Sequence, residues 1–250
     1  MTVLAVHAPS LGAERYTLRI AGDATEVAAA QRLRHRVFAE ELGATLHSPV
    51  PGLDVDEFDD YCDHLIVVAE EAGEVVGTYR MLPPGRSPKR YASGEFDLSG
   101  LGDLDGQLVE TGRSCVDSAH RDGAVINLMW AGIARYLRLT GYRWLAGCAS
   151  VDLSDGGSTA AGVWELAVRK HLSPAGYRVL PHQPWTPVER PAGRVAVPPL
   201  LRGYLRLGSW ICGAPAYDPA FRCADFFVLL GLDRVDPRYL RHFLGEEAAP

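Results

Sequence analysis

Two charged residues interrupt an apolar stretch at residues 108–116, and they are the residues best suited to chemistry. Glu110 and Arg113 lie three positions apart in a segment that reads as a strand. On a flat strand this odd spacing directs the two side chains to opposite faces, so one should face a cleft or a partner. A carboxylate there could accept a proton from an ammonium nucleophile, directly or through water. The alternative is an ion pair at the sheet edge.

A turn follows this strand and leads into a helix. Residues 117–123 (DSAHRDG) join the strand to an apolar helical pattern at residues 125–139. The free N–H groups at a helix start form an anion site, here suited to one phosphate. Arg121 could add a charge-assisted hydrogen bond to that phosphate. The alternative is a capped turn that binds no ligand.

A long acidic loop is predicted between residues 44 and 63, where periodicity is weak. It could bind a cationic substrate or a metal, or it could be a solvated acidic loop. The run DVDEFD lacks the glycine and the distal glutamate of a calcium loop. Phe58 within it indicates that part of the loop packs down. Its acids are Asp54, Asp56, Glu57, Asp59, Asp60 and Asp63.

Composition and missing motifs exclude several classes of protein. The net charge of -6 argues against general binding to nucleic acid. Five cysteines without a C-x-x-C pair argue against disulfides or a zinc ribbon. The histidines show no metal-ligand spacing, so we expect no metal. The serine-hydrolase elbow G-x-S-x-G and the phosphate-binding glycine motifs are also absent, so we expect no tightly bound cofactor.

The chain is expected to be soluble and cytoplasmic. No apolar run approaches the roughly 20 residues that cross a bilayer, and the N-terminus lacks a secretory pattern.

A helix predicted at residues 200–212 carries Arg202 and Arg206 beside a broad apolar face. This helix could pack in the core, or it could contact anionic lipid as a peripheral element on the inner face of the membrane.

The elements that must position these residues alternate along the chain. Their order predicts one layered α/β domain over residues 15–243, with tails at 1–14 and 244–250. A capping box at residues 23–26 begins the first helix, and Gly43 ends it. Strands are predicted at 16–21, 64–69, 75–82, 108–116, 144–151 and 226–230, and helices at 27–42, 125–139, 160–171 and 200–212.

Eight segments, taken in order and spacing, resemble one enzyme family. They are residues 33–43 (LRHRVFAEELG), 56–59 (DEFD), 62–64 (CDH), 76–82 (VGTYRML), 95–98 (EFDL), 110–116 (ETGRSCV), 198–208 (PPLLRGYLRLG) and 224–229 (ADFFVL). They resemble the bacterial L-ornithine Nα-acyltransferases, some called hemolysin-like, which make lyso-ornithine lipid from an acyl-acyl-carrier-protein. The resemblance covers about residues 15–243. It implies a GNAT-like acyl-CoA N-acyltransferase fold, a mixed central sheet flanked by helices.

A more distant resemblance is to the acyl-homoserine-lactone synthases. Their R-x-x-x-F pattern falls on Arg34 and Phe38, and their tryptophan is replaced by Ala44, which argues against use of S-adenosylmethionine. Their other characteristic residues fall on the acidic pair Asp56 and Asp59, the strand arginine Arg80, and the E-x-x-R pair Glu110 and Arg113.

The turn before the second helix departs from that of coenzyme-A-dependent GNAT enzymes, which carry R/Q-x-x-G-x-G/A. Here Gly123 comes one place early, and Ala124 and Ile126 stand where small flexible residues are expected. Such glycines let the backbone approach a diphosphate closely. A phosphopantetheine arm presents a single phosphate, so the turn favours acyl carrier protein as donor and partner. The donor-binding set is Arg121, Gly123, Ala124 and Val125.

The reaction that the resemblance implies is N-acylation of an amino acid, ornithine, by transfer of a (3-hydroxy)fatty acyl group from the carrier thioester. Glu110 is the expected base, with His64 as its rival. Backbone N–H groups near Cys115 and Val116 would hold the oxyanion. A covalent Cys115 intermediate is disfavoured, because a buried strand thiol usually has a raised pKa.

The remaining substrate-binding roles fall on the acidic loop and its surroundings. Asp56 and Asp59 would hold the cationic amino acid. Arg34, Arg80 and Arg113 would shape the site or bind the substrate carboxylate. Phe38 and Phe58 complete the substrate-binding set. The alternatives are an enzyme with another amine acceptor or an acyl-CoA donor, and a non-catalytic GNAT-fold module that binds an acyl carrier or a membrane.

Overall fold

The computed structural model describes residues 6–7, 15–187, 196–236 and 238–239, which belong to two compact units. The first unit comprises Met1–Arg86, Thr111–Tyr142 and Pro237–Pro250, and the second comprises Ser87–Glu110 and Arg143–Asp236. Strand β6 (Leu108–Val116) contributes its first three residues to the second unit and the rest to the first. The single domain predicted for residues 15–243 therefore stays a prediction. The predicted tail 244–250 lies outside the described residues.

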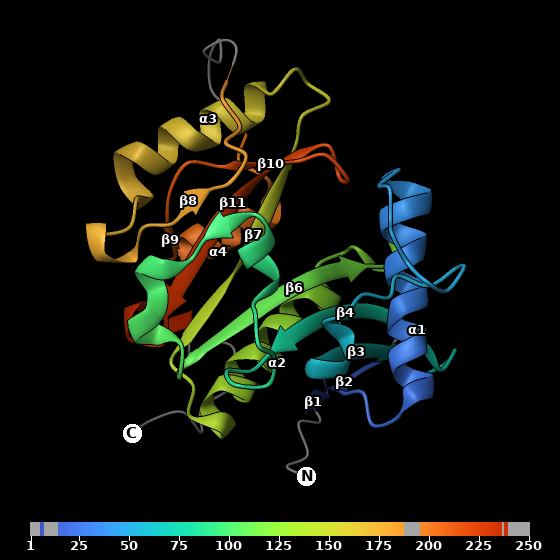
Figure 1. The fold of residues 1–250 in the computed structure, drawn as a ribbon. Helices are drawn as coiled ribbons and strands as arrows, with labels where there is room; N and C mark the ends of the chain where they lie inside the picture. The colour runs from blue at the N-terminus through green and yellow to red at the C-terminus, as the bar shows by residue number, and fades with distance from the viewer. Residues whose placement is uncertain (1–5, 8–14, 188–195, 237, 240–250) are drawn as a thin grey trace. The chain divides into compact units, whose positions relative to one another are not determined.

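The first unit contains an antiparallel run of strands in the order β1-β2-β3-β4, and β6 follows β4 in the strand order (Figure 1). These strands are β1 (Val6–His7), β2 (Tyr16–Ile20), β3 (Asp63–Ala69) and β4 (Glu74–Leu82). β1 falls in the predicted tail 1–14, whose other residues are not described. Leu65, Ile66 and Val67 of β3 are all fully buried, which requires that both faces of the strand be covered.

Two helices provide that cover. On β4, a Cβ added to Gly77 would lie 2.5 Å from Cγ1 of Val125, so α2 (Ala124–Thr140) packs directly against this face. Helix α1 (Ala24–His35) packs on β4 and β3 (Figure 1). Asp23 caps α1 by accepting a hydrogen bond from the N–H of Glu26 at 3.0 Å, as the capping box predicts.

Helix α1 continues into a π-helical turn at Arg36–Glu41, in which Leu42 donates to the carbonyl of Val37. Gly43 follows at a φ of 69°, in the left-handed region that glycine adopts most readily. The helix predicted as far as Leu42 is therefore present, with its last turn widened. Such π-turns occur frequently at functional sites.

The second unit is built on a long antiparallel pair. β7 (Trp144–Asp152) and β11 (Cys223–Gly231) pair along their whole length. β7 also pairs in parallel with Leu108–Glu110 of β6, and β9 (Trp210–Ile211) and β10 (Ala216–Asp218) pair with β11. A separate ladder joins β5 (Phe96–Asp97) and β8 (Leu180–Pro181).

The two faces of this sheet bury different cores. One packs on α3 (Ser158–Leu166) and α4 (Pro199–Arg206) through Ala149, Val151 and Phe226. The other packs on the segment 87–107 through Ala146, Phe227 and Leu229. Side chains alternate between faces along a strand, so Cys148 and Asp225 share the second face. The predicted mixed sheet with flanking helices is thus present.

The helix predicted at residues 200–212 is wrong in its second half. α4 ends at Arg206, Gly208 adopts a φ of 96°, and Trp210–Ile211 forms β9. Leu201 and Leu205 are buried, so the apolar face of α4 packs in the core and does not form a lipid-facing surface. Among the described residues, no helix has both the length and the apolarity that crossing a membrane requires.

Candidate active site

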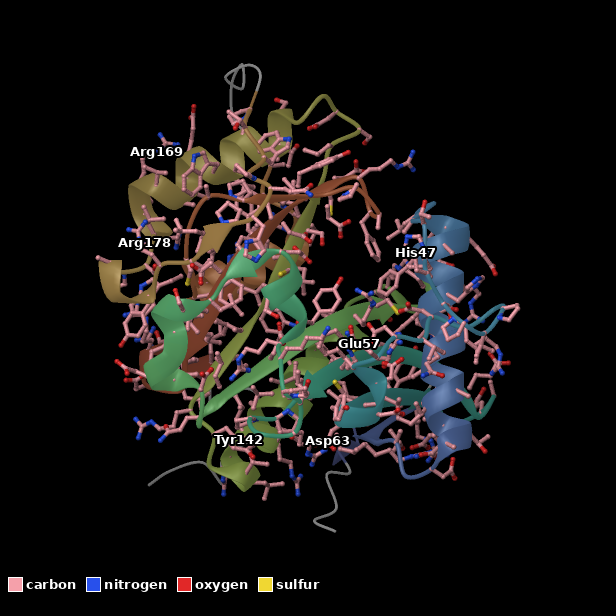
Figure 2. The ribbon with its side chains drawn as sticks, viewed as in Figure 1. His47, Glu57, Asp63, Tyr142, Arg169 and Arg178 are labelled. Atoms are coloured by element: carbon pink, nitrogen blue, oxygen red, sulfur yellow. The ribbon has the colours of Figure 1, made fainter. Side chains whose placement is uncertain are left out.

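A buried ion-pair network anchors the acidic loop of the first unit. Arg34 of α1 is completely buried, and its guanidinium donates to both carboxylate oxygens of Asp59, at 3.0 and 2.9 Å. Its Nε donates to Oδ2 of Asp54 at 2.9 Å, and its NH2 group donates to the backbone carbonyl of Asp54. Gln31, one helical turn earlier, donates to Asp59 at 3.0 Å. Glu57, labelled in Figure 2, marks this loop.

Two more arginines complete the network. Arg80 of β4 donates to Oδ1 of Asp56 at 2.5 Å and to Oδ1 of Asp59 at 3.0 Å. Arg113 of β6 donates to Oδ2 of Asp54 at 3.1 Å, and its NH2 lies 3.7 Å from Oδ2 of Asp56. The network thus joins three guanidinium groups to three carboxylates.

The pairing of its carboxylates with arginines determines what the acidic loop can bind. Burial alone would raise the pKa of Asp59, but Arg34 and Arg80 outweigh it and hold that pKa well below its ordinary value. Asp59 is 4% exposed and already paired, so the geometry favours a positioning role for it over direct contact with a cation. In Asp56, by contrast, Oδ2 is buried and has no hydrogen-bond partner among the described residues.

The backbone of Arg113 is unusual for a strand. Its φ of 51° lies in the left-handed region, where a non-glycine residue is strained. The flat-strand argument for Glu110 and Arg113 therefore does not hold at this position. The Arg113 guanidinium donates a hydrogen bond to Asp54, so the residue with this irregular backbone is also tied to the network.

Both predicted aromatic residues are buried, and Phe58 contacts the network. Phe38 belongs to the π-turn and is buried. Phe58 is buried in the acidic loop, and the guanidinium carbon of Arg80 lies 5.8 Å from the centre of its ring. This distance is within the range of a cation–π contact. Phe58 therefore packs down, as its place in the loop indicates.

His64 of β3 is 3% exposed and lies against the same network. Its Nε2 is 3.1 Å from the backbone carbonyl of Asp59, so this nitrogen carries the proton in the neutral ring. Its Nδ1 is buried and has no partner among the described residues. Burial lowers the pKa of His64, which keeps the ring neutral at neutral pH.

Cys115 and Val116 end β6. Cys115 is buried, and burial raises the pKa of its thiol to about 12. A thiol with this pKa is almost entirely protonated at neutral pH, which supports the expectation that it forms no covalent intermediate. The carbonyl of Val116 accepts a hydrogen bond from Nε of Arg121 at 3.0 Å.

Glu110 is held by the backbone of the second unit. Its two carboxylate oxygens accept hydrogen bonds from the N–H groups of Tyr91 and Ala92, at 2.8 and 2.7 Å. Glu110 is 5% exposed and is the last residue of β6 that pairs with β7, opposite Ala146. The carboxylate therefore has a fixed orientation in a buried setting, which suits a positioned acid or base.

The turn predicted to bind the donor holds Arg121 in a different contact. Arg121 donates from both NH groups to the carboxylate of Glu41, at 2.5 and 2.8 Å. Gly123 precedes α2 at a φ of 103°, and the N–H of Ala124 donates to Oδ1 of Asp122 at 2.9 Å. The next N–H groups, of Val125 and Ile126, bond to no acceptor among the described residues. A helix N-terminus with free N–H groups is thus present, but Arg121 is already paired.

Some functional candidates have no signature in the sequence. The amides of Tyr91 and Ala92 hold Glu110 through their backbone, so their side chains do not reveal the role. Glu95 and Asp225 lie in two of the segments that carry the resemblance, and the structure brings them together beside Cys148. Their place in these segments is the one sequence signal that could have identified Glu95 and Asp225.

Solved structures with a similar fold are acyltransferases of related kinds. A coenzyme-A-dependent acyl-homoserine lactone synthase superposes with a TM-score of 0.55 at 19% identity, over 89% of this chain and 83% of the other. An N-acyl amino acid synthase from uncultured soil microbes superposes with a TM-score of 0.52 at 13% identity, over 88% and 93% of the two chains. At these identities the likeness establishes the fold alone.

Sequence relatives are closer. Residues 33–131 match the family described as "Acetyltransferase (GNAT) domain". The L-ornithine Nα-acyltransferase of Brucella abortus (strain 2308) is 34% identical over 92% of this chain and 89% of its own. The L-ornithine Nα-acyltransferase of Rhodobacter capsulatus is 33% identical over 90% of this chain and 93% of its own. Identity at this level over nearly the full length of both chains places this enzyme in the L-ornithine Nα-acyltransferase family.

Proposed function

We propose that this protein transfers a fatty acyl group from an acyl-carrier-protein thioester to the α-amine of L-ornithine, giving lyso-ornithine lipid. The observation that carries the proposal is the match to relatives named L-ornithine Nα-acyltransferase over about 90% of the chain. A thioester is already activated, so the protein must orient two reactants and remove a proton from the amine.

Glu110 is the proposed base. The α-ammonium of an amino acid must lose a proton before its nitrogen can attack a carbonyl. A carboxylate that accepts this proton, directly or through water, must be held in place while the acceptor binds. The N–H groups of Tyr91 and Ala92 provide that orientation. His64 stays the rival, since it is neutral and its Nδ1 can accept a proton.

The acyl transfer then proceeds without a covalent enzyme intermediate. The amine attacks the thioester carbonyl, the carbonyl oxygen becomes an oxyanion, and the carbon–sulfur bond breaks as the amide forms. The phosphopantetheine thiol leaves with a proton. The backbone N–H groups near Cys115 and Val116 are the proposed donors to the oxyanion. The raised pKa of the Cys115 thiol supports this direct route.

Roles in the ion-pair network follow from its contacts. Arg34 and Asp59 are proposed as positioning residues, because each is fully paired with protein partners. Asp56 is the proposed contact for a cationic group, because its Oδ2 accepts no hydrogen bond from the described residues and only the ion-pair contact of 3.7 Å to Arg113 approaches it. Arg80 and Arg113 are proposed to shape the site or to meet the substrate carboxylate, which the planar guanidinium matches.

An acyl carrier protein is the proposed donor and protein partner. Arg121 is engaged with Glu41, and Asp122 places a negative charge at the start of α2. Both features weaken binding of the 3′-phosphorylated nucleotide diphosphate of coenzyme A. The N–H groups of Val125 and Ile126 suffice for the single phosphate of the carrier arm.

The direct test is a reaction panel. Purified protein is incubated with a 3-hydroxyacyl-carrier-protein or its unsubstituted counterpart and with one amino acid or polyamine at a time, and products are read by mass. We expect acylated ornithine as the main product. Acylation of another amine with higher efficiency would reassign the acceptor. Retention of the carrier protein without turnover of any thioester would indicate a non-catalytic module.

A further inference from the structure

The second unit contains a cluster of acids and thiols that the proposed reaction does not yet use. Glu95, Cys148 and Asp225 place their polar atoms within 4.8 Å of one another, and Asp218, Cys223 and Asp225 do the same. Asp225 belongs to both groups and is 3% exposed. We call these five residues the Glu95–Asp225 cluster.

The cluster lacks a positive charge. No ion pair joins Glu95, Asp218 or Asp225 to a basic side chain of the described residues. Oε2 of Glu95 is buried and has no hydrogen-bond partner within the described part of the chain. Burial and the neighbouring Asp225 raise the pKa of Glu95, and burial raises that of Asp225. With a pKa of about 9, Glu95 keeps its proton at neutral pH when no cation is bound. A bound cation would let Glu95 ionise, as the arginines keep Asp59 ionised in the first unit.

The strand register places the cluster next to Glu110. Glu110 pairs with Ala146 on β7, and Cys148 lies two residues further along on the same face. Two residues of strand span about 7 Å. Glu110 is also close enough to contribute to the raised pKa of Cys148. Glu95 follows directly after Tyr91–Gly94, the turn whose N–H groups hold Glu110.

From this arrangement we infer that the Glu95–Asp225 cluster binds the side-chain ammonium of a diamino acid acceptor while Glu110 serves its α-amine. The inference rests on the proposed function and names the acceptor's second binding point. The two nitrogens of ornithine are about 6 Å apart in an extended chain. This length is similar to the distance of about 7 Å along β7 from Ala146, which pairs with Glu110, to Cys148. This assignment replaces Asp56 as the contact for the side-chain ammonium, because Arg80 and Arg113 already balance the charge of Asp56.

The chemistry of the thiols favours an ammonium over a metal ion. Cys223 donates from its Sγ to Oδ1 of Asp225 at 3.5 Å, and a thiol that donates is protonated. Burial also raises the pKa of Cys148 well above its ordinary value. A metal ion binds thiolates, whereas an ammonium donates hydrogen bonds to carboxylates and leaves the thiols protonated.

The test compares ornithine with norvaline, which has the same carbon chain and no side-chain amine. With acyl-carrier protein as donor, we expect kcat/KM for ornithine to exceed that for norvaline by at least about 10², because norvaline cannot supply the hydrogen bonds that the side-chain ammonium donates to the buried cluster. In Glu95→Gln and Asp225→Asn, this ratio should fall below about tenfold. The activity on norvaline itself should be retained or increased in both variants.

Asp97→Asn is the matched control. Asp97 lies two residues from Glu95, is exposed, and accepts a hydrogen bond from the N–H of Ser99 at 2.9 Å. The same loss of one negative charge there should leave the ornithine-to-norvaline ratio unchanged. Melting temperatures of all three variants, with calorimetric binding of ornithine to the intact protein, separate loss of recognition from loss of folding.

The outcomes separate this inference from the proposed function. Absence of any N-acylation by the wild-type protein would overturn the proposed function itself. Acylation of ornithine with an unchanged ratio in folded Glu95→Gln and Asp225→Asn would overturn only the cluster assignment. Stoichiometric metal in the purified protein, lost in both variants, would also overturn it in favour of a metal site.

Discussion

The guanidinium of Arg34 holds both carboxylate oxygens of Asp59, at 3.0 and 2.9 Å, and neither side chain is more than 4% exposed. This pair joins α1 to the acidic loop. A planar fork makes both hydrogen bonds at once, which a lysine ammonium cannot reproduce. The pair is therefore the point at which the acidic loop depends most strongly on a single side chain.

Arg34→Lys should lower the free energy of unfolding by about 3 kcal/mol, the range for a broken buried ion pair. The control is Arg36→Lys, two residues later, where an exposed arginine pairs with Asp117. That change should stay within about 0.5 kcal/mol of wild type. Urea denaturation measures both. Equal effects of the two substitutions would show that the buried pair is not the anchor of the loop.

Asp59 should make the free energy of unfolding depend on pH in the acidic range. Its folded-state pKa is lowered, so the unfolded state binds its proton more tightly. The stabilisation is complete above the ordinary aspartate value of about 3.9 and is lost as pH falls below it. The difference in unfolding free energy between wild type and Asp59→Asn should therefore be large at pH 7 and shrink below about pH 4. A difference that stays constant down to pH 3 would contradict the assignment.

The main strands and helices were predictable because their apolar periodicity is strong. β6 has the predicted bounds, and α2 exceeds its prediction by one residue at each end. The error at residues 200–212 has a physical cause. Leu207 and Ile211 keep helical spacing, but Gly208 turns the chain and Trp210–Ile211 pairs with the distant strand β11.

The candidate site was predictable in its residue types and less so in their contacts. Arg34, Asp56, Asp59 and Arg80 do lie together, as the resemblance implies. The pairing of Asp59 with arginines could not be predicted, because it depends on tertiary distances that a local sequence pattern does not contain. The same holds for Glu110, whose partners are backbone N–H groups.

Glu110→Gln should lower kcat at pH 7 by at least about 10², the contribution typical of a positioned base. The loss should shrink as pH rises, because more of the amine is then already deprotonated. Steady-state rates from pH 6.5 to 9.5, with melting temperatures, measure this. A Glu110→Gln enzyme within a few-fold of wild type, beside an inactive and folded His64→Gln, would move the base to His64.

Donor preference follows from the start of α2. We expect kcat/KM for the acyl-carrier protein to exceed that for the matching acyl-coenzyme A by at least about tenfold, or about 1.4 kcal/mol. Asp122→Asn should narrow this gap by removing a negative charge from the start of α2, although it keeps an oxygen for the N–H of Ala124. Initial rates with both donors at one chain length provide the comparison. Equal efficiencies in the wild-type enzyme would remove the argument for a carrier protein.

The position of the acyl group on ornithine tests the central claim most directly. Ornithine labelled with nitrogen-15 only at its α-amine is incubated with the purified protein and an acyl-carrier protein, and the product is fragmented by tandem mass spectrometry. We expect a singly acylated ornithine whose amide nitrogen carries the label. An unlabelled amide nitrogen, or no acylated ornithine at all, would contradict it.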